Sequence, residues 1–163
     1  MIKVLVTGGD GQLGMCFKHI RNNHSFIKFY FLNKSILDIT NYQSILKFIK
    51  KNDLDYIINC AAYTLVDKAE IEIEEARIIN VIGVQNLIRV SEIFKIKLIH
   101  ISTDYVFDGY GGIEIKELEN TNPLGVYGKT KLSGEKLILK STSKAIVVRT
   151  SWLFSPFGNN FVK

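Results

Sequence analysis

The sequence predicts an α/β fold in which helices cover both faces of a parallel β-sheet. Short apolar runs alternate with longer segments of helical periodicity along the chain of 163 residues. These runs are apolar throughout, as expected of strands that are buried on both faces. The composition, with 47% hydrophobic and 23% charged residues, is that of a soluble globular protein, and the length suffices for one domain.

The first part of the chain alternates strand and helix twice. The run "KVLVTG" at 3–8 is apolar and ends in glycine, which predicts a buried strand. A helix is expected at 11–21, and "IKFYFL" at 27–32 is expected to be a second strand. The segment at 40–52 has an amphipathic pattern, and Thr40 is its expected N-cap because its oxygen can accept a hydrogen bond from the first turn.

The middle of the chain continues this alternation. The run "DYIINCAA" at 55–62 predicts a third strand. One long or broken helix is expected from about 67 to 94, where small and apolar residues recur near a 3.6-residue period. The run "KLIHIST" at 97–103 predicts a fourth strand, and the segment 104–125 is rich in turn-forming residues.

The last part adds a helix to about 141, starting with "VYGKTK", and a fifth strand, "AIVVRTSW", at 145–152. The segment "GNNFVK" at 158–163 looks like the beginning of another helix. This order of elements predicts right-handed crossovers and a doubly wound, Rossmann-type sheet in one domain over 1–163. Ligands of such sheets bind at the carboxyl ends of the strands, so the residues after each strand are the candidates for a site.

Charge, cysteine content and hydropathy exclude several classes of protein. The net charge is +5, but the lysines are scattered rather than gathered on one stripe, so no nucleic-acid partner is expected. Cys16 and Cys60 are the only cysteines and form no metal-binding pattern, and Cys60, in an apolar run, is expected to be a buried free thiol. No apolar run approaches a membrane span, and the apolar N-terminal run is too short for a signal peptide, so a cytoplasmic protein without a membrane partner is expected.

A glycine-rich loop follows the first expected strand. In "TGGDGQLG" at 7–14, Gly8, Gly11 and Gly14 are spaced three residues apart. Glycine permits positive φ and a close approach of the backbone to a ligand. The free N–H groups and the dipole of the following helix would hold the pyrophosphate of a dinucleotide. A simple tight turn is the alternative, but the position between strand and helix favours the dinucleotide site.

The end of the second strand bears on the choice of nicotinamide cofactor. An acidic residue at this place binds the adenosine 2′-hydroxyl of NAD, whereas a basic residue suits the 2′-phosphate of NADP. Asn33 and Lys34 offer no carboxylate here. NADPH is therefore the expected cofactor, with NADH left open, and a solvated loop position is an equal alternative for Lys34.

Small and hydroxyl-bearing residues follow the third and fourth expected strands. Ala61 and Ala62 in "CAAYT" would let a nucleotide pass over the strand end, although packing in the core would explain these alanines as well. The stretch "STDYVF" begins with Ser102, Thr103 and Asp104, whose oxygens lie where they could hydrogen-bond a ligand. Serine and threonine are also common in loops, so this stretch indicates a ligand site only in combination with the other motifs.

Tyr127 and Lys131 are separated by four positions on the last expected helix, so they lie on one helix face. A free tyrosine has a pKa of about 10, which is high for acid–base chemistry at neutral pH. A nearby ammonium group would stabilise the phenolate and lower that pKa. The pair is therefore expected to transfer a proton to a carbonyl oxygen while hydride reaches its carbon. A lysine-rich surface helix is the alternative.

These motifs resemble the extended short-chain dehydrogenase/reductase superfamily, through "TGGDGQLG", "STDYVFDG" and "YGKTK". More closely, the chain resembles the dTDP-4-dehydrorhamnose reductase family in "ILDITN", "IINCAAYTLVDKAE", "HISTDYVFDG", "PLGVYGKTKLSGEK" and "RTSWLFSPFGNNF", in order along almost the whole chain. The resemblance implies an enzyme that uses NADPH to reduce the 4-keto group of dTDP-4-dehydro-L-rhamnose. The product, dTDP-L-rhamnose, is a polysaccharide precursor.

The resemblance also implies roles for individual residues. Thr103 would hydrogen-bond the substrate carbonyl, Tyr127 would donate the proton, and Lys131 would bind the nicotinamide ribose and tune the tyrosine. Asp104 and Trp152 would contact the dTDP-sugar. The other implied cofactor contacts are Gly8, Gly11, Gln12, Leu13 and Gly14 at the pyrophosphate, Asp38 and Ile39 at the adenine, and Ala62, Tyr63 and Thr64 along the nucleotide.

Two features depart from the family pattern. Some members carry a glutamate at the position of Cys16 that contributes to a magnesium-linked dimer. A thiol is a poor ligand for magnesium, so no metal ligand is assigned, and magnesium and a homodimer are left open. Family members also continue with a smaller substrate lobe, most of which residues 1–163 are expected to lack.

Two alternatives to a reductase remain. The tyrosine stretch also resembles the regulatory subunit of methionine adenosyltransferase, which would make the chain a binding module rather than an enzyme. A sugar-nucleotide epimerase or dehydratase of the same superfamily is the other alternative. A dehydratase often carries an Asp–Glu pair after its active-site threonine, whereas Tyr105 follows Asp104 here.

Overall fold

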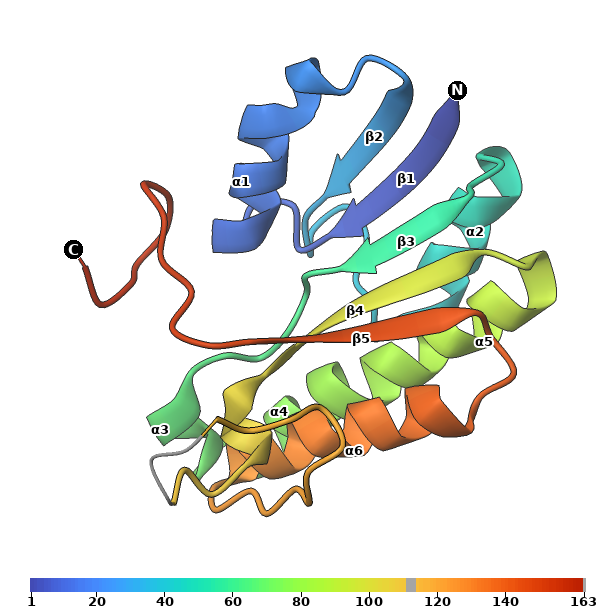
Figure 1. The fold of residues 1–163 in the computed structure, drawn as a ribbon. Helices are drawn as coiled ribbons and strands as arrows, with labels where there is room; N and C mark the ends of the chain where they lie inside the picture. Colours follow the sequence, from blue (N-terminus) through green and yellow to red (C-terminus); the bar gives the residue numbers. More distant parts are fainter. Residues whose placement is uncertain (111–113, 163) are drawn as a thin grey trace.

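The computed structural model describes residues 1–110 and 114–162 and confirms the α/β class. The described residues form a five-stranded sheet in the order β2-β1-β3-β4-β5, in which all neighbouring strands are parallel (Figure 1). The strands are β1 (Ile2–Thr7), β2 (Ile27–Leu32), β3 (Tyr56–Asn59), β4 (Lys97–Thr103) and β5 (Ala145–Thr150). The helices are α1 (Gln12–Ile20), α2 (Tyr42–Lys51), α3 (Val66–Ala69), α4 (Ile73–Arg77), α5 (Val84–Phe94) and α6 (Val126–Lys140). Short 3₁₀ segments lie at Arg21–Asn23 and Asp104–Val106.

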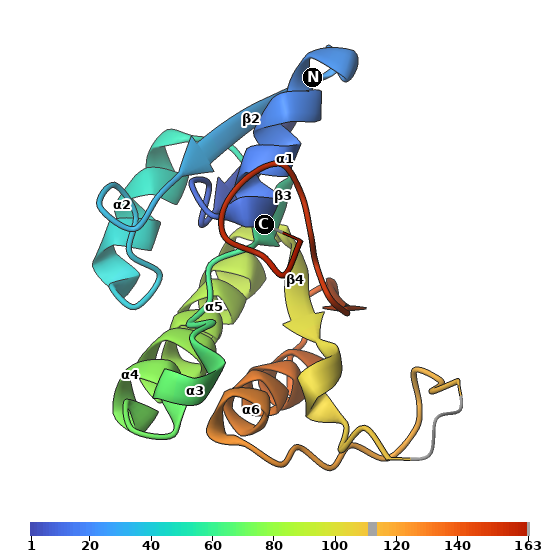
Figure 2. The same cartoon turned by 90° about the vertical axis from the view of Figure 1, so that its left-hand side faces the viewer.

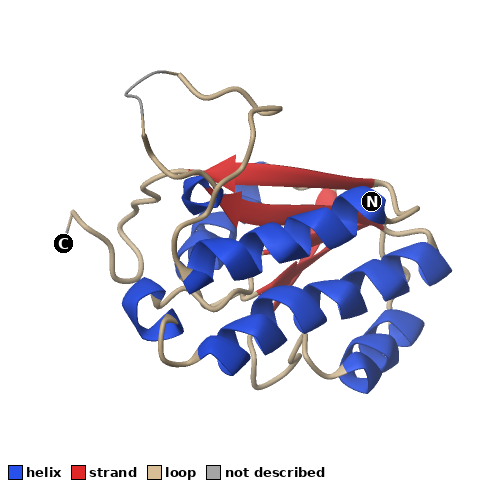
Figure 3. Ribbon diagram, turned by 90° about the horizontal axis from the view of Figure 1, so that it is seen from below, coloured by secondary structure: helices blue, strands red, loops and turns tan. Residues whose placement is uncertain are grey.

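Helices cover the two faces of the sheet unequally. The chain moves from β1 to β2 in one direction and from β2 to β3, β4 and β5 in the other. Because crossovers between parallel strands are right-handed, α1 lies on one face, and α2, α5 and α6 lie on the other (Figures 1 and 2). Seen from below, the long helices run side by side against the sheet (Figure 3). The main core lies between these helices and the sheet, where Leu5, Ile57 and Leu98 are almost completely buried.

The expected long helix between β3 and β4 is broken. Helices α3 and α4 are followed by a π-helical segment, Ile78–Gly83, that continues into α5. Gly83 and Gly134 permit close packing here, because a Cβ at Gly83 would lie 2.6 Å from Ile39 Cδ1 and one at Gly134 would lie 2.5 Å from the carbonyl oxygen of Asn80. Such π-segments often occur at functional sites, and this one holds Asn80 inside the protein.

The expected N-cap of the second helix is wrong by one residue. Asn41 caps α2, since its side-chain oxygen accepts a hydrogen bond from the backbone N–H of Ser44. Thr40 instead donates its hydroxyl and its backbone N–H to Asp38 Oδ1. Asparagine and threonine are both good capping residues, and the side chain of Asp38 decides between them here.

Other element boundaries differ from the expected ones mainly at the carboxyl ends of strands. β3 ends at Asn59 and β5 at Thr150, so 60–62 and 151–152 leave the sheet and become available to a site. The helix expected at 158–163 does not form over the described residues 158–162, and Lys163 lies outside the described residues. The turn-rich segment 104–125 is irregular after its 3₁₀ turn, and 111–113 within it also lie outside them. Over the described ranges, no helix is long and apolar enough to cross a membrane.

A buried ion pair joins α6 to β5. Glu135 is fully buried, and its carboxylate accepts hydrogen bonds from Nε and Nη2 of Arg149, at 3.1 and 2.7 Å respectively. Arg149 also donates to the carbonyl oxygen of Glu117 and lies over the ring of Phe107, 5.0 Å from its centroid. The pair therefore ties the helix that carries Tyr127 to the edge of the sheet.

Replacing Glu135 by glutamine should lower the free energy of unfolding by about 2–4 kcal/mol, because the amide cannot accept both guanidinium hydrogen bonds and Arg149 loses its counter-charge. Urea denaturation followed by circular dichroism measures this loss. Glu119→Gln is the matched control, since Glu119 is exposed, and it should change stability by less than about 0.5 kcal/mol. Equal stability of the two variants would contradict the structural role of the pair.

Candidate active site

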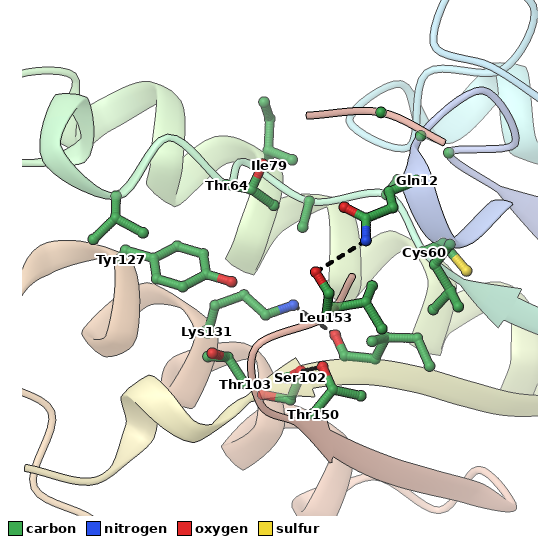
Figure 4. Close-up of a pocket in the computed structure, with 18 of the residues that line it drawn as sticks. Gln12, Cys60, Thr64, Ile79, Ser102, Thr103, Tyr127, Lys131, Thr150 and Leu153 are labelled. Carbon is green, nitrogen blue, oxygen red and sulfur yellow. Dashed lines mark hydrogen bonds between the residues drawn. The ribbon is translucent and has the colours of Figure 1, made fainter. Parts of the chain in front are cut away.

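A cavity of about 840 Å³ lies at the carboxyl ends of the strands, where the fold predicts a ligand site. Its volume is in the usual range for a cofactor site. Loops after β1, β2, β3, β4 and β5 and the first turns of α1 and α6 all contribute to its walls (Figure 4). Of the residues expected at a site, the cavity is lined by Gly8, Gly11, Gln12, Leu13, Asp38, Ile39, Ala62, Thr64, Thr103, Asp104, Tyr127, Lys131 and Trp152.

The glycine loop forms the entry of α1. Gly8 adopts a φ of +63°, and a Cβ there would lie 2.8 Å from the backbone nitrogen of Ala61. Gly14 lies behind the loop rather than in the cavity wall, and a Cβ there would lie 2.5 Å from the carbonyl oxygen of Gly8. Gly11 is the N-cap of α1, with no side-chain capping bond and no acidic residue in the first turn within the described structure. This cradle therefore fits an anionic group, because the helix dipole and backbone N–H groups favour one.

The loop after β2 presents one cation and one carboxylate. Lys34 and Asp38 line the cavity, whereas Asn33 uses its side-chain oxygen to accept from the hydroxyl of Ser35 and the backbone N–H of Ile36. Asn33 therefore shapes the turn. Lys34 lines the cavity just after β2, where a basic residue suits an adenosine 2′-phosphate.

Tyr63 faces away from the cavity, unlike its neighbours Ala62 and Thr64. Its side chain is 6% exposed, and its hydroxyl donates to Glu72 Oε2. The backbone of Tyr63 is held at both polar groups by Asn80, whose Oδ1 accepts from the N–H at 2.9 Å and whose Nδ2 donates to the carbonyl at 3.1 Å. The side chain of Tyr63 does not line the cavity, so its contact with a nucleotide remains a prediction.

Asn80 also links this segment to α6. Its Nδ2 donates to Oγ1 of Thr130, which in turn donates to the carbonyl oxygen of Tyr127. One buried amide thus positions both the loop after β3 and the first turns of the helix that carries the tyrosine. Sequence reasoning missed Asn80, although a single polar residue inside the apolar run "IINVIG" was a signal for a buried hydrogen-bonding role.

The end of β4 carries a hydroxyl and a carboxylate next to each other. Oγ1 of Thr103 accepts from the backbone N–H of Tyr105 and donates to Asp104 Oδ1, at 3.2 and 3.1 Å. The other carboxylate oxygen of Asp104 accepts from the hydroxyl of Ser151, which joins the ends of β4 and β5. The hydroxyl of Ser102 is buried, lines the cavity and has no hydrogen-bond partner among the described residues. A buried hydroxyl of this kind is expected to bind a ligand or water.

Tyr127 and Lys131 project from α6 into the same part of the cavity as Thr103 (Figure 4). Tyr127 is 9% exposed, and its ring packs edge-on against Tyr105 with the centroids 5.6 Å apart. Lys131 is 2% exposed, and its Nζ donates to the carbonyl oxygen of Ile101 at 2.7 Å. The structure therefore places the predicted catalytic residues around one space, next to the loop that begins α1.

The pKa values differ from the sequence-based expectation. Burial raises the pKa of Tyr127 above 10.0; the nearby hydroxyl of Thr103 partly opposes this effect, and the charge of Asp104 adds to it. Burial also lowers the pKa of Lys131 from 10.5 to about 8, and the nearby Glu135 limits this fall. The expectation that Lys131 lowers the pKa of Tyr127 is therefore wrong for this structure. Both groups are buried, and burial favours the neutral phenol and the neutral amine.

Trp152 and the residues after it close one side of the cavity. Trp152 adopts a φ of +47° and is 70% exposed, and its ring contacts that of Phe161, with the centroids 5.0 Å apart. The side chain of Gln12 donates to the carbonyl oxygen of Leu153 and so joins this segment to the start of α1 (Figure 4). Sequence reasoning missed Leu153 and Phe161 because no periodic pattern marks an irregular segment.

Comparison with known proteins points to one family. A family model described as the RmlD substrate binding domain matches residues 2–163. A dTDP-4-dehydrorhamnose reductase of Aggregatibacter actinomycetemcomitans is 44% identical over 163 residues, which are 100% of this chain and 55% of that protein. The chain spans about half the length of the curated relatives it matches.

Solved structures agree with this similarity. A dTDP-4-dehydrorhamnose reductase of Clostridium acetobutylicum has a TM-score of 0.93 and 40% identity, over 99% of this chain and 57% of that one. A dTDP-4-dehydrorhamnose reductase of Bacillus anthracis in complex with NADP has a TM-score of 0.91 and 39% identity, over 99% of this chain and 58% of that one.

The thiol of Cys60 lines the cavity, and burial raises its pKa from 9.0 to about 12, an effect that the charge of Lys131 partly opposes. Only the thiolate reacts with iodoacetamide, so Cys60 should be alkylated at pH 8 roughly a thousand times more slowly in the native chain than in urea. Mass spectrometry of the Cys16→Ser variant, which leaves one thiol, measures both rates. Equal rates in native and unfolded chains would contradict this environment.

Proposed function

The chain belongs to the family of the RmlD substrate binding domain, and we propose that it carries the cofactor-binding and catalytic part of a reductase. The proposed reaction is the reduction of the 4-keto group of dTDP-4-dehydro-L-rhamnose by NADPH, which yields dTDP-L-rhamnose. The observation that carries this proposal is that Thr103, Tyr127 and Lys131 share one cavity with the glycine loop. The similarity to reductases of this name supports the substrate.

Each end of the cavity has a distinct task in this proposal. Gly8, Gly11 and the first turn of α1 bind the pyrophosphate through backbone N–H groups. Lys34 contacts the 2′-phosphate of the adenosine, which favours NADPH, and Asp38 contacts the adenine side of the ligand. NADH remains a second cofactor to test, because Asp38 could hydrogen-bond ribose hydroxyls.

The chemistry of this chain's own residues is proton donation and orientation. When bound, NADPH supplies the hydride. Tyr127 holds its proton because burial raises the pKa of its phenol, so it is in the acid form that a ketone reduction needs. It donates this proton to the developing alkoxide, while the hydroxyl of Thr103 hydrogen-bonds the same oxygen. Lys131 lies on the floor of the cavity, where its amine would contact the ribose of the cofactor.

The substrate is proposed to bind at the end of the cavity that Trp152 and Asp104 line. Trp152 is largely exposed there, and Asp104 lies between the end of β4 and the serine after β5. These two residues are proposed to contact the dTDP-sugar. A dehydratase of similar fold is less consistent with the site, because Tyr105 occupies the place where dehydratases often carry a glutamate.

NADPH binding tests the assignment of the glycine loop. Gly11→Val should weaken NADPH binding at least tenfold, because its side chain would stand where the pyrophosphate approaches. Gly11 has a φ of −72°, so valine does not strain the backbone. Fluorescence titration of NADPH measures the affinity, and Gly11→Ala, whose Cβ would lie 3.3 Å from the carbonyl oxygen of Gly8, should show a smaller loss. Unchanged affinity in the folded valine variant would show that the ligand binds elsewhere.

Removal of one oxygen tests the proposed acid. Tyr127→Phe should lower the rate of reduction of dTDP-4-dehydro-L-rhamnose by roughly 10²–10⁴-fold, the usual effect of losing a positioned acid. Affinity for NADPH should change less than threefold, since only the hydroxyl is lost. The rate is measured as NADPH oxidation by the complete product of the gene. Tyr110→Phe, at an exposed tyrosine, is the control and should retain full activity. Full activity of Tyr127→Phe would refute the assignment.

A further inference from the structure

A row of buried polar side chains crosses the sheet beneath the cavity. Thr7, Asn59 and His100 are direct partners in the parallel register of β1, β3 and β4. They are 0%, 1% and 1% exposed, respectively. Polar residues at the centre of a buried sheet are costly unless they are hydrogen-bonded, so their partners call for an explanation.

The three side chains form a chain of hydrogen bonds. The hydroxyl of Thr7 donates to Asn59 Oδ1 at 2.7 Å. Asn59 Nδ2 lies 2.9 Å from His100 Nδ1, and an amide NH₂ group can only donate. His100 Nδ1 is therefore the acceptor. Since burial holds the pKa of His100 well below 6.5, the ring is neutral and carries its single hydrogen on Nε2.

This hydrogen points at Lys131. His100 Nε2 lies 3.4 Å from Lys131 Nζ. A neutral amine has a lone pair that can accept the Nε2 hydrogen while it donates its own hydrogen to the carbonyl of Ile101. An ammonium group has no lone pair, so its hydrogens and the Nε2 hydrogen would oppose each other. The geometry thus discriminates between the two protonation states of Lys131.

The other titratable groups near Lys131 come from α6 itself and from the loop after β3. Glu135, one helical turn away on α6, favours the ammonium, but its carboxylate is engaged by Arg149. Cys60, after β3, remains a neutral thiol because its pKa is about 12. Tyr127 remains a neutral phenol. Cys60 and Tyr127 therefore supply the amine with no negative charge at neutral pH.

We propose that His100 is a positioning residue for Lys131: held by Asn59 and Thr7, it presents its Nε2 hydrogen to the lysine amine and favours the neutral amine in the free protein. The row of Thr7, Asn59 and His100 then holds Nζ of Lys131 in place. The protonation state of this amine therefore depends on whether a ligand occupies the cavity. The phosphates and ribose hydroxyls of a bound ligand would raise the pKa of Lys131 above about 8, so binding at a pH above this value takes up a proton. This last step rests on the proposed function, whereas the hydrogen-bond arrangement does not.

Nitrogen NMR of the free chain tests the arrangement directly. In the chain labelled with ¹⁵N-histidine, two-bond proton–nitrogen spectra at pH 9 distinguish the two neutral tautomers. The chain has three histidines, and His100→Phe identifies the signals of His100. We expect the hydrogen on Nε2. A hydrogen on Nδ1 would mean that Asn59 accepts from the ring and that Nε2 accepts from an ammonium, and it would overturn the proposal.

The lysine itself is titrated by ¹³C NMR, with Lys131→Met identifying its signal. Thr7→Val removes the hydroxyl that fixes Asn59, so the ring should populate both tautomers and the pKa of Lys131 should rise by roughly half a unit or more. Thr150→Val is the matched control, because Thr150 makes its hydrogen bond to the carbonyl of Ser102 instead. An unchanged Lys131 titration in a folded Thr7→Val chain would contradict a positioning role.

Calorimetry separates this inference from the proposed function. NADPH binding at pH 8.5, measured in two buffers of different ionisation enthalpy, should show uptake of roughly half a proton, and Lys131→Met should abolish it. Binding without uptake would refute the change in charge. Absence of binding would refute the proposed cofactor. The tautomer of His100 and the titration of Lys131 in the free chain would then still test the role of His100.

Discussion

The parallel register of β1, β3 and β4 is the constraint on which the site depends. It sets Thr7, Asn59 and His100 in one row across the sheet and brings the carboxyl ends of these strands to one edge. Lys131 reaches this row from α6, and its amine spans the distance between the sheet and the cavity. The glycine loop and the end of β4 line the same cavity as that lysine. The sheet thus fixes both the place of the cavity and the chemistry of its floor.

The position of α6 depends on buried polar contacts as well as on apolar packing. Asn80 holds the first turns of this helix through Thr130, and Glu135 holds its later turns through Arg149. Such groups stabilise a fold only when all their hydrogen bonds are made, and they also fix one arrangement among several that an apolar core would accept. A helix held at two places by polar groups presents its tyrosine and lysine in a defined direction. A proton donor needs that precision, because it must lie within hydrogen-bond distance of the atom that it protonates.

The sequence predicted the parts of the fold and site that follow from local pattern. The glycine loop and Thr103 lie at the carboxyl ends of predicted parallel strands, and Tyr127 and Lys131 share one helix face. The predicted fold therefore places these residues near one another. The direction of the Tyr63 side chain could not be predicted in this way. It depends on the amide of Asn80, which holds the backbone of Tyr63. The raised pKa of Tyr127 was also out of reach, since it depends on burial in three dimensions. The N-cap of α2 depends on Asp38, which engages Thr40.

A crystal structure of this chain with NADP⁺ would show whether one cavity holds both the cofactor and the proton donor. We expect the pyrophosphate against the backbone of Gly11 and the start of α1, and the nicotinamide ribose within hydrogen-bond distance of Lys131 Nζ. The nicotinamide ring would then lie beside the hydroxyls of Tyr127 and Thr103. A dinucleotide bound elsewhere, or one whose nicotinamide end points away from Tyr127, would refute the proposed site.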